Sequence, residues 1–196
     1  MNYFEVFDLE RKLGIDREAL QRAYYELSRR WHPDYQQGAS ADAQAQALDR
    51  SALVNAAYRT LRDPLARIEY LVRLEEGRET KEGATVKPQA PPELLEEIFE
   101  LQETLQEAKA GGLDAAGRAR LAAERDTLAS RHRAEEARLS GSLSAQWDAA
   151  GPGERAAVLD AFKRSLATRA YLKSVLDDLN AVLDESQESH VAHHRH

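Results

Sequence analysis

Apolar residues in the first third of the chain recur at helical spacing. One stripe that begins shortly after Asp16 consists of Leu20, Ala23, Tyr24, Leu27 and Trp31. At about 100° per residue these side chains share one face of a helix. Asp16 suits the N-cap position, and Pro33 ends the pattern because the residue before a proline avoids the helical conformation. We therefore expect an amphipathic helix from Asp16 to about His32.

A second stripe predicts a helix from Ser40 to about Arg62. Its apolar face is formed by Ala47, Ser51, Val54, Ala57, Tyr58 and Leu61. Pro64 suits the first position of a further helix, where its missing N–H is not needed. That helix would lay Leu65, Ile68, Leu71 and Val72 on the first two. The two long helices then form an antiparallel pair joined by an exposed loop.

A change in composition divides the chain. Residues 77–92 are rich in Gly and Pro and predict a linker over 76–92, between a domain at 1–75 and a second domain at 93–185. The second domain is rich in Ala, Leu, Glu and Arg, with glycine breaks near 111 and 151, which predicts a three-helix bundle. The last segment, 186–196, loses apolar periodicity and is expected to be a flexible tail. The predicted class is all-α.

The core of this bundle is expected to come largely from its second and third helices, at about 114–149 and 152–184. Their candidate core positions are Leu121, Leu128, Leu139, Trp147, Val158, Leu159, Phe162, Leu166, Tyr171, Leu172, Val175, Leu176, Leu179 and Leu183. The first helix, from Pro92, has one stripe at Leu94, Ile98, Leu101 and Leu105, with Leu95 and Phe99 beside it. One stripe is enough for one core contact, so either one stripe faces outward or both pack inside the bundle.

Composition narrows the function classes. With 27 Lys and Arg against 34 Asp and Glu, the net charge is −7, which argues against a phosphate-neutralising surface and hence against nucleic acid. The absence of cysteine excludes disulfides, thiolate metal sites, cysteine nucleophiles and thiolate ligation of an iron–sulfur cluster. No apolar run reaches the length of a signal peptide or a membrane span, so we expect a cytoplasmic protein without a membrane partner.

The residue pattern contains no signal for catalysis or cofactor binding. It lacks a phosphate-cradling glycine loop, and no serine, histidine and acid combination comes with supporting loop signals. His132 lies between two arginines on a helix expected to be exposed. The tail histidines, His190, His193, His194 and His196, would take up divalent metal only adventitiously, because they have no fixed geometry. We expect neither an enzyme, a cofactor nor a functional metal site.

The tripeptide His32-Pro33-Asp34 carries the functional signal. It follows an amphipathic helix that ends in Trp31 and precedes a helix carrying VNAAYRTLRDPLAR from Val54. This arrangement resembles a J-domain, the module that couples clients to the DnaK class of ATPase chaperones. YFEVF at residues 3–7 and EYLVRL at residues 69–74, together with the second domain, narrow the resemblance to the HscB family of iron–sulfur cluster assembly.

The resemblance implies that His32, Pro33 and Asp34 contact an HscA/DnaK-type chaperone and promote its ATP hydrolysis. Proline fixes the turn, and the Asp34 carboxylate can pair with an arginine of the partner. The basic surface of the preceding helix, Arg22, Arg29 and Arg30, would meet an acidic face of the chaperone, although a merely solvated face is an equal alternative. The chain departs from the usual pattern at Tyr35 and Glu26, where J-domains often have a base.

The resemblance also implies a second partner, an IscU-type iron–sulfur scaffold, and an L-shaped arrangement of the domains. The expected scaffold-binding residues are Leu94, Leu95, Ile98 and Phe99 for apolar contact and Glu96, Glu97 and Glu100 for charge. The alternative is a J-domain adapter that recruits a general chaperone to a different client. The two hypotheses differ in what the helix of residues 93–109 binds.

Overall fold

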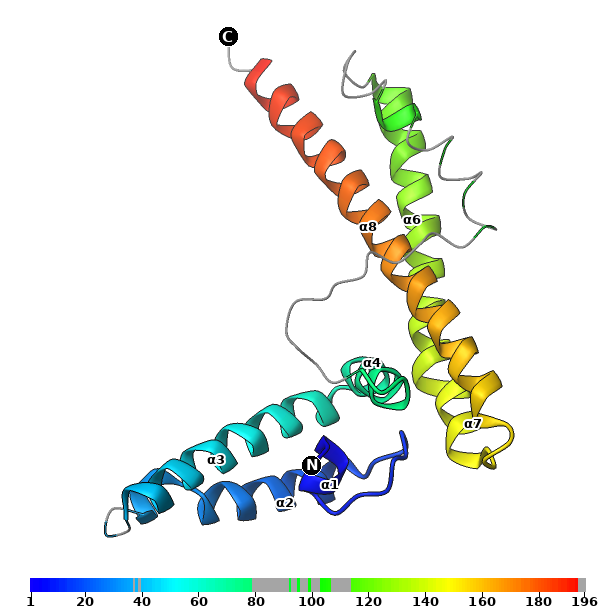
Figure 1. The fold of residues 1–196 in the computed structure, drawn as a ribbon. Helices are drawn as coiled ribbons and strands as arrows, with labels where there is room; N and C mark the ends of the chain where they lie inside the picture. Colours follow the sequence, from blue (N-terminus) through cyan, green and yellow to red (C-terminus); the bar gives the residue numbers. More distant parts are fainter. Residues whose placement is uncertain are drawn as a thin grey trace. The chain divides into compact units, whose positions relative to one another are not determined.

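The computed structural model describes residues 1–36, 38, 40–78, 92, 95, 99, 103–106 and 114–193. Side chains are described for all of these except 33, 36 and 185–193. Its elements are α1 (Tyr3–Val6), α2 (Arg17–Arg30), the 3₁₀ helix η1 (Pro33–Gln36), α3 (Ala41–Arg62), α4 (Pro64–Glu75), α6 (Ala115–Arg138), the π-helical segment η2 (Leu139–Leu143), α7 (Ser144–Ala149) and α8 (Arg155–His193) (Figure 1). No strand occurs in the part of the chain described, and the predicted all-α class is confirmed.

The chain forms two compact units that are interleaved along the sequence. The N-terminal unit consists of Met1–Glu82 together with Leu139–Phe162, and the C-terminal unit consists of Gly83–Arg138 together with Lys163–His196. The first boundary falls within the predicted linker. The second division differs from the predicted one, because residues 139–162 lie with the N-terminal unit and not with the bundle predicted at 93–185.

The α2–α3 hairpin forms for the reasons that the sequence pattern suggested. The Asp16 carboxylate accepts hydrogen bonds from the amides of Glu18 and Ala19, at 2.9 and 3.1 Å, and so caps α2. Between the helices, Tyr24 and Tyr58 stack with ring centroids 4.0 Å apart. The predicted stripes are buried or half-buried, at Leu20, Ala23, Tyr24, Leu27 and Trp31 in α2 and at Ala47, Ser51, Val54, Ala57, Tyr58 and Leu61 in α3.

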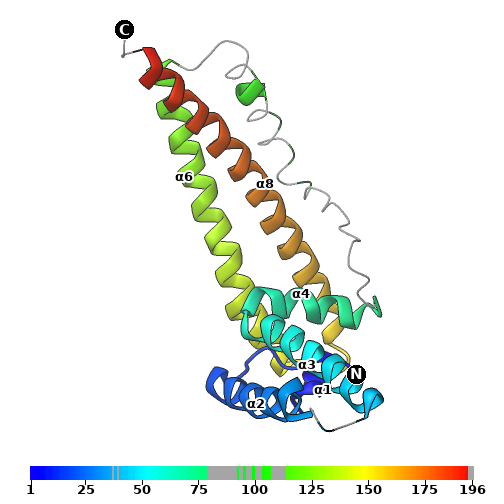
Figure 2. The same ribbon diagram turned by 90° about the vertical axis from the view of Figure 1, so that its left-hand side faces the viewer.

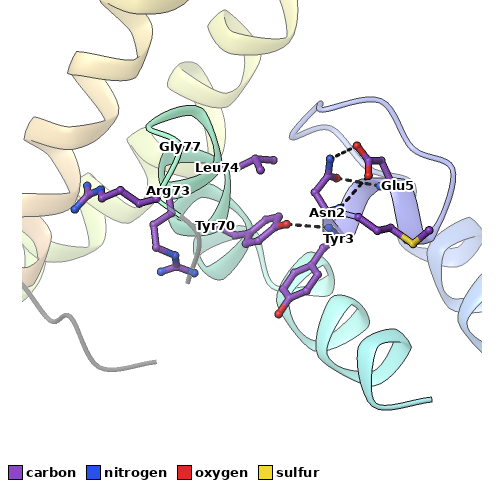
Figure 3. Close-up of a pocket in the computed structure, with 9 residues that line it drawn as sticks. Asn2, Tyr3, Glu5, Tyr70, Arg73, Leu74 and Gly77 are labelled. Atoms are coloured by element: carbon purple, nitrogen blue, oxygen red, sulfur yellow. Dashed lines mark hydrogen bonds between the residues drawn. The ribbon is translucent and has the colours of Figure 1, made fainter. Parts of the chain in front are cut away.

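Tyrosines join the start of the chain to α4. Figure 3 shows the capping box of α1, in which the side chains of Asn2 and Glu5 satisfy each other's backbone amides. The Tyr3 amide donates to the Tyr70 hydroxyl at 2.8 Å, and the two rings stack at 4.4 Å. These residues line one side of an open cavity of about 510 Å³, which Arg73 and the end of α4 complete. The contacts fix α1 on α4.

Because the Tyr70 hydroxyl is partly buried, we expect the protein to lose stability at alkaline pH. Burial raises its pKa above the ordinary value of 10.0, against the opposing effect of the Tyr3 amide bond. Because the folded pKa is raised, the stabilisation is present below about pH 10 and is lost as the pH rises through the folded value. We expect the free energy of unfolding in urea to fall above about pH 10, and to fall less steeply in Tyr70→Phe.

The matched control for this experiment is Tyr25→Phe, which removes a hydroxyl from an exposed ring on α2. It should keep the wild-type dependence on pH. If Tyr70→Phe followed the wild-type slope as well, the buried phenol would not be the group responsible.

Residues from α7 complete the N-terminal unit. The Asp148 carboxylate accepts the amides of Leu13 and Gly14 at 2.7 and 2.6 Å, and the Trp147 indole Nε1 donates to the carbonyl of Arg11 at 3.0 Å. Buried Arg67 of α4 is 5% exposed, and its pKa is lowered by that burial and by the nearby charge of Arg17. The carboxylates of Asp148 and Asp63 act in the opposite sense, by attraction. Asp148 therefore serves both the loop before α2 and the buried charge of Arg67.

Five predicted bundle positions belong elsewhere. Leu139, Trp147 and Phe162 are buried and Val158 and Leu159 are half-buried, but all five lie in the N-terminal unit. The reason is a polar match that periodicity does not show: the indole N–H has its acceptor on the loop before α2. The chain reaches this position through the π-helical segment, where the register of α6 changes before α7 begins.

The C-terminal unit is built largely from α6 and the later part of α8, which run side by side (Figure 2). Its core is formed by Leu105, Leu121, Leu128, Leu172, Val175, Leu179, Val182 and Leu183. Polar pairs also link the helices: the Ser165 hydroxyl donates a hydrogen bond to the Glu135 carboxylate, and Arg169 Nε lies 2.9 Å from a Glu136 carboxylate oxygen.

Helix α8 continues to His193, past the predicted helix end at Asp184 and through most of the predicted tail. Of the helices described, none is long and apolar enough to cross a bilayer.

Candidate functional site

The His32-Pro33-Asp34 segment lies in the loop that joins α2 to α3, at the closed end of the hairpin (Figure 1). Trp31 is the C-cap of α2, and its amide donates to the Leu27 carbonyl at 3.0 Å. The segment then turns through η1, where the Tyr35 amide donates to the carbonyl of His32 at 3.1 Å. Short-range bonds therefore fix a compact turn directly after the helix, and the side chains of His32 and Asp34 are exposed.

The geometry of this turn decides what its two polar side chains offer. The Asp34 amide donates to Nδ1 of His32 at 3.2 Å, so in the neutral ring the proton sits on Nε2. The same Nδ1 lies 3.6 Å from Asp34 Oδ2, a contact that becomes an ion pair only when the ring is protonated. The two interactions exclude each other because Nδ1 either accepts or donates. With a neutral ring, the Asp34 carboxylate, 74% exposed, is free to meet a partner.

The arginines predicted to face a chaperone have different surroundings. Arg22 and Arg29 are exposed on α2, and Arg22 makes a loose ion pair with Glu18 at 3.7 Å. Such an exposed pair contributes little, so it does not hold Arg22 back from a partner. Arg30 is also exposed, but its guanidinium lies over the Trp31 ring, 5.3 Å from the centroid. Arg22 and Arg29 are consequently better placed than Arg30 to meet another protein.

The two departures from the usual J-domain pattern are both exposed. Glu26 is exposed on α2, and Tyr35 is exposed beside His32, with the two rings edge to face and their centroids 6.1 Å apart. An acid at one position and a neutral phenol at the other take the place of positive charge. An aromatic ring stands where the pattern often has a base.

A second candidate surface lies in the C-terminal unit. Leu95 is 41% exposed and Phe99 is 71% exposed, whereas Leu105 of the other stripe is buried in the core cluster. The described members of the two stripes are therefore separated: one stripe contributes to the core, and Leu95 and Phe99 face solvent. The predicted contact residues Leu94, Glu96, Glu97, Ile98 and Glu100 lie outside the residues described.

Within the described part of the chain, no group of three or more His, Cys, Asp or Glu side chains is placed to hold a metal ion. His132, expected to be exposed, is half-buried, and its Nε2 lies 3.8 Å from Oε1 of Glu136.

Sequence reasoning missed Arg50 of α3, whose guanidinium lies 6.0 Å from the Trp31 ring centroid. The sequence offered one indication of this contact: Arg50 is a basic residue on the helix predicted to pair with the helix that ends at Trp31.

Comparison with known proteins agrees with this geometry. The DnaJ domain matches residues 2–70. Curated relatives from Neisseria meningitidis serogroups B and C, each named co-chaperone protein HscB homolog, are 39% identical over 115 residues, which covers 56% of this chain and 64% of theirs. The match thus spans just under two thirds of the relatives' length.

Two solved structures resemble the whole chain more broadly. Chaperone HscB from Vibrio cholerae has a TM-score of 0.57 and 28% identity, over 95% of this chain and 99% of its own. The human co-chaperone protein HscB has a TM-score of 0.60 and 25% identity, over 92% of this chain and 81% of its own. Both likenesses extend well beyond the segment that matches the DnaJ domain.

Proposed function

Since the chain belongs to the HscB family of J-domain proteins, we propose that it is a co-chaperone of iron–sulfur cluster assembly. In this role its His32-Pro33-Asp34 turn stimulates ATP hydrolysis by an HscA/DnaK-type chaperone. Its C-terminal unit delivers an IscU-type scaffold, with the cluster as cargo, to that chaperone. The chemistry takes place on the chaperone, and this chain breaks no bond.

One observation carries the first half of the proposal. The Asp34 carboxylate is exposed in the loop of the α2–α3 hairpin, and with a neutral His32 ring no cation among the described residues forms an ion pair with it. A carboxylate held in this way can accept a bidentate, charge-assisted pair from an arginine of the chaperone. Arg22 and Arg29 supply positive charge on the preceding helix, which raises the rate of encounter with an acidic face.

The second half rests on Leu95 and Phe99. Exposed large apolar side chains next to each other on a helix are typical of a protein-binding surface. Their exposure favours the scaffold-binding hypothesis over the alternative in which both stripes pack inside the bundle. The identity of the client comes from the family and not from these two side chains, so the adapter hypothesis with a different client stays the alternative.

The test is the steady-state ATPase rate of a purified HscA/DnaK-type chaperone with this protein added, in the presence and absence of an IscU-type scaffold. Stimulation that the scaffold amplifies would support the whole proposal. Stimulation that the scaffold leaves unchanged would contradict the proposed client and favour the adapter. No stimulation at all would overturn the co-chaperone role.

A double substitution distinguishes binding of the scaffold from stimulation of the chaperone. We expect Leu95→Ala with Phe99→Ala to weaken scaffold binding by roughly 30-fold, the factor for about 2 kcal/mol lost at an interface hot spot. Stimulation of the chaperone without scaffold should remain at the wild-type level, because both residues lie in the C-terminal unit. Calorimetric titration of the scaffold measures the first effect and the ATPase rate the second.

Leu48→Ala is the matched control, since Leu48 is an apolar residue on α3 of the other unit whose exposure lies between those of Leu95 and Phe99. It should leave scaffold affinity unchanged. Undiminished scaffold affinity in the double variant would show that the scaffold, if bound, uses another surface.

A further inference from the structure

Trp31, the residue directly before His32, is held by a cation from the opposite helix. The Arg50 guanidinium of α3 lies over its ring, 6.0 Å from the centroid. Arg30 lies over the same ring at 5.3 Å, but it belongs to α2 and moves with the tryptophan. Arg50 thus makes a contact from α3 to the end of α2. At such distances a guanidinium is attracted to the negative face of an indole.

The rest of Arg50's surroundings leave it available for this contact. Its Nη1 lies 3.6 Å from the sulfur of Met1, a weak acceptor. Among the described residues no carboxylate pairs with Arg50, although acids are abundant in the chain. The guanidinium is therefore directed to a ring and a sulfur, both soft partners, and not to an ion pair.

The orientation of the turn depends on Trp31, the residue that precedes it. The backbone amides of the turn donate short-range hydrogen bonds: Trp31 to Leu27, His32 to Arg29, Asp34 to His32 and Tyr35 to His32. They fix the internal shape of the turn, whereas its direction depends on its contacts with α3 and on the Trp31 ring that precedes it. We propose that Arg50 is a positioning residue, which orients the His32-Pro33-Asp34 turn by holding the Trp31 ring.

This inference rests on the proposed function for its effect on a chaperone. If Arg50 raises the population of the competent orientation, its loss lowers the apparent affinity by the same factor. We expect Arg50→Met to raise the concentration of this protein needed for half-maximal ATPase stimulation by roughly two- to fivefold, the factor that corresponds to one exposed cation–π contact. The maximal rate should stay unchanged, because the Asp34 carboxylate is still present.

A double-mutant cycle distinguishes positioning from direct contact with the chaperone. Arg50→Met is measured in the wild-type chain and in a Trp31→Leu background, with Arg59→Met, an exposed base of the same helix, as the charge control. If Arg50 acts through the ring, its effect disappears in the Trp31→Leu background. An effect of equal size in both backgrounds, or one matched by Arg59→Met, would overturn the proposal.

A second measurement needs no chaperone. The chain has two tryptophans, so ¹⁵N-labelled protein gives two indole N–H signals in its NMR spectrum. Arg50→Met should shift the Trp31 indole and the His32 and Asp34 amides and leave the Trp147 indole in place. Unshifted His32 and Asp34 amides would overturn the positioning role. If the wild-type protein failed to stimulate any chaperone, the proposed function would fall, and these spectra would still decide whether Arg50 orients the turn.

Discussion

Asp34→Asn is expected to reduce chaperone stimulation to the basal ATPase rate. The substitution keeps the size of the side chain and removes its charge, so it replaces a charge-assisted pair with a neutral hydrogen bond and leaves an arginine of the partner unpaired. Truncating one partner of such a pair costs about 2 kcal/mol or more, which is at least a roughly 30-fold loss of affinity. The ATPase rate of the chaperone, titrated with each variant, measures this directly.

The fold should not change in this variant. Asp34 is exposed, and its hydrogen bond to His32 comes from the backbone amide, which asparagine retains. Asp177→Asn is the matched control: it makes the same chemical change at an exposed i,i+4 pair with Lys173 in the C-terminal unit, and it should stimulate like the wild type. Full stimulation by Asp34→Asn would mean that the tripeptide is only a turn.

Trp147→Ala is expected to have the largest effect on stability. The indole is 1% exposed, lies near the Phe162 ring with the Arg155 guanidinium over it, and donates a hydrogen bond to the carbonyl of Arg11. Its truncation leaves a cavity and an unpaired carbonyl, which together cost about 3–5 kcal/mol. Since small domains have a free energy of unfolding of about 5–15 kcal/mol, this is a large part of the total. Urea unfolding followed by far-UV circular dichroism provides the value.

Phe99→Ala provides the comparison of a buried with an exposed aromatic ring. Phe99 is 71% exposed, so its removal should change the free energy of unfolding by no more than about 0.5 kcal/mol. A loss in Trp147→Ala as small as that in Phe99→Ala would show that the indole does not complete the packing of the N-terminal unit.

The helices of the N-terminal unit were predictable because their information is local. Asp16 and Pro64 punctuate the chain through backbone chemistry that depends on near neighbours, and each lies where it was expected. The apolar stripes of α2 and α3 show the period of a helix directly. The position of Trp147 was not predictable in this way, because a stripe shows that a residue is buried but not against which element. The acceptor of its indole lies on a loop more than a hundred residues earlier in the chain.

The candidate site also has features that local sequence predicts and features that depend on long-range packing. The turn at His32 and Asp34 is a short motif, and its exposed position follows from the helix that ends before it. Which stripe of the helix after Pro92 faces solvent depended on long-range packing, and the burial of Leu105 against exposed Phe99 supplied the answer. Arg50 was not predictable because the apolar stripe places Trp31 on one face of a helix and does not show that its ring is half-buried and available to a cation.

The interleaving of the two units affects how the protein is made. Ribosomal synthesis proceeds from the N-terminus, and domains usually fold in that order as they emerge. The N-terminal unit departs from this order, since Trp147 and Asp148 are added after the whole of the C-terminal unit's α6 has been synthesised. Until then the amides of Leu13 and Gly14 lack their acceptor, and buried Arg67 lacks one of its two carboxylates. The nascent chain therefore carries an unfinished first unit, and translation that stops before residue 139 leaves it without the segment that closes it.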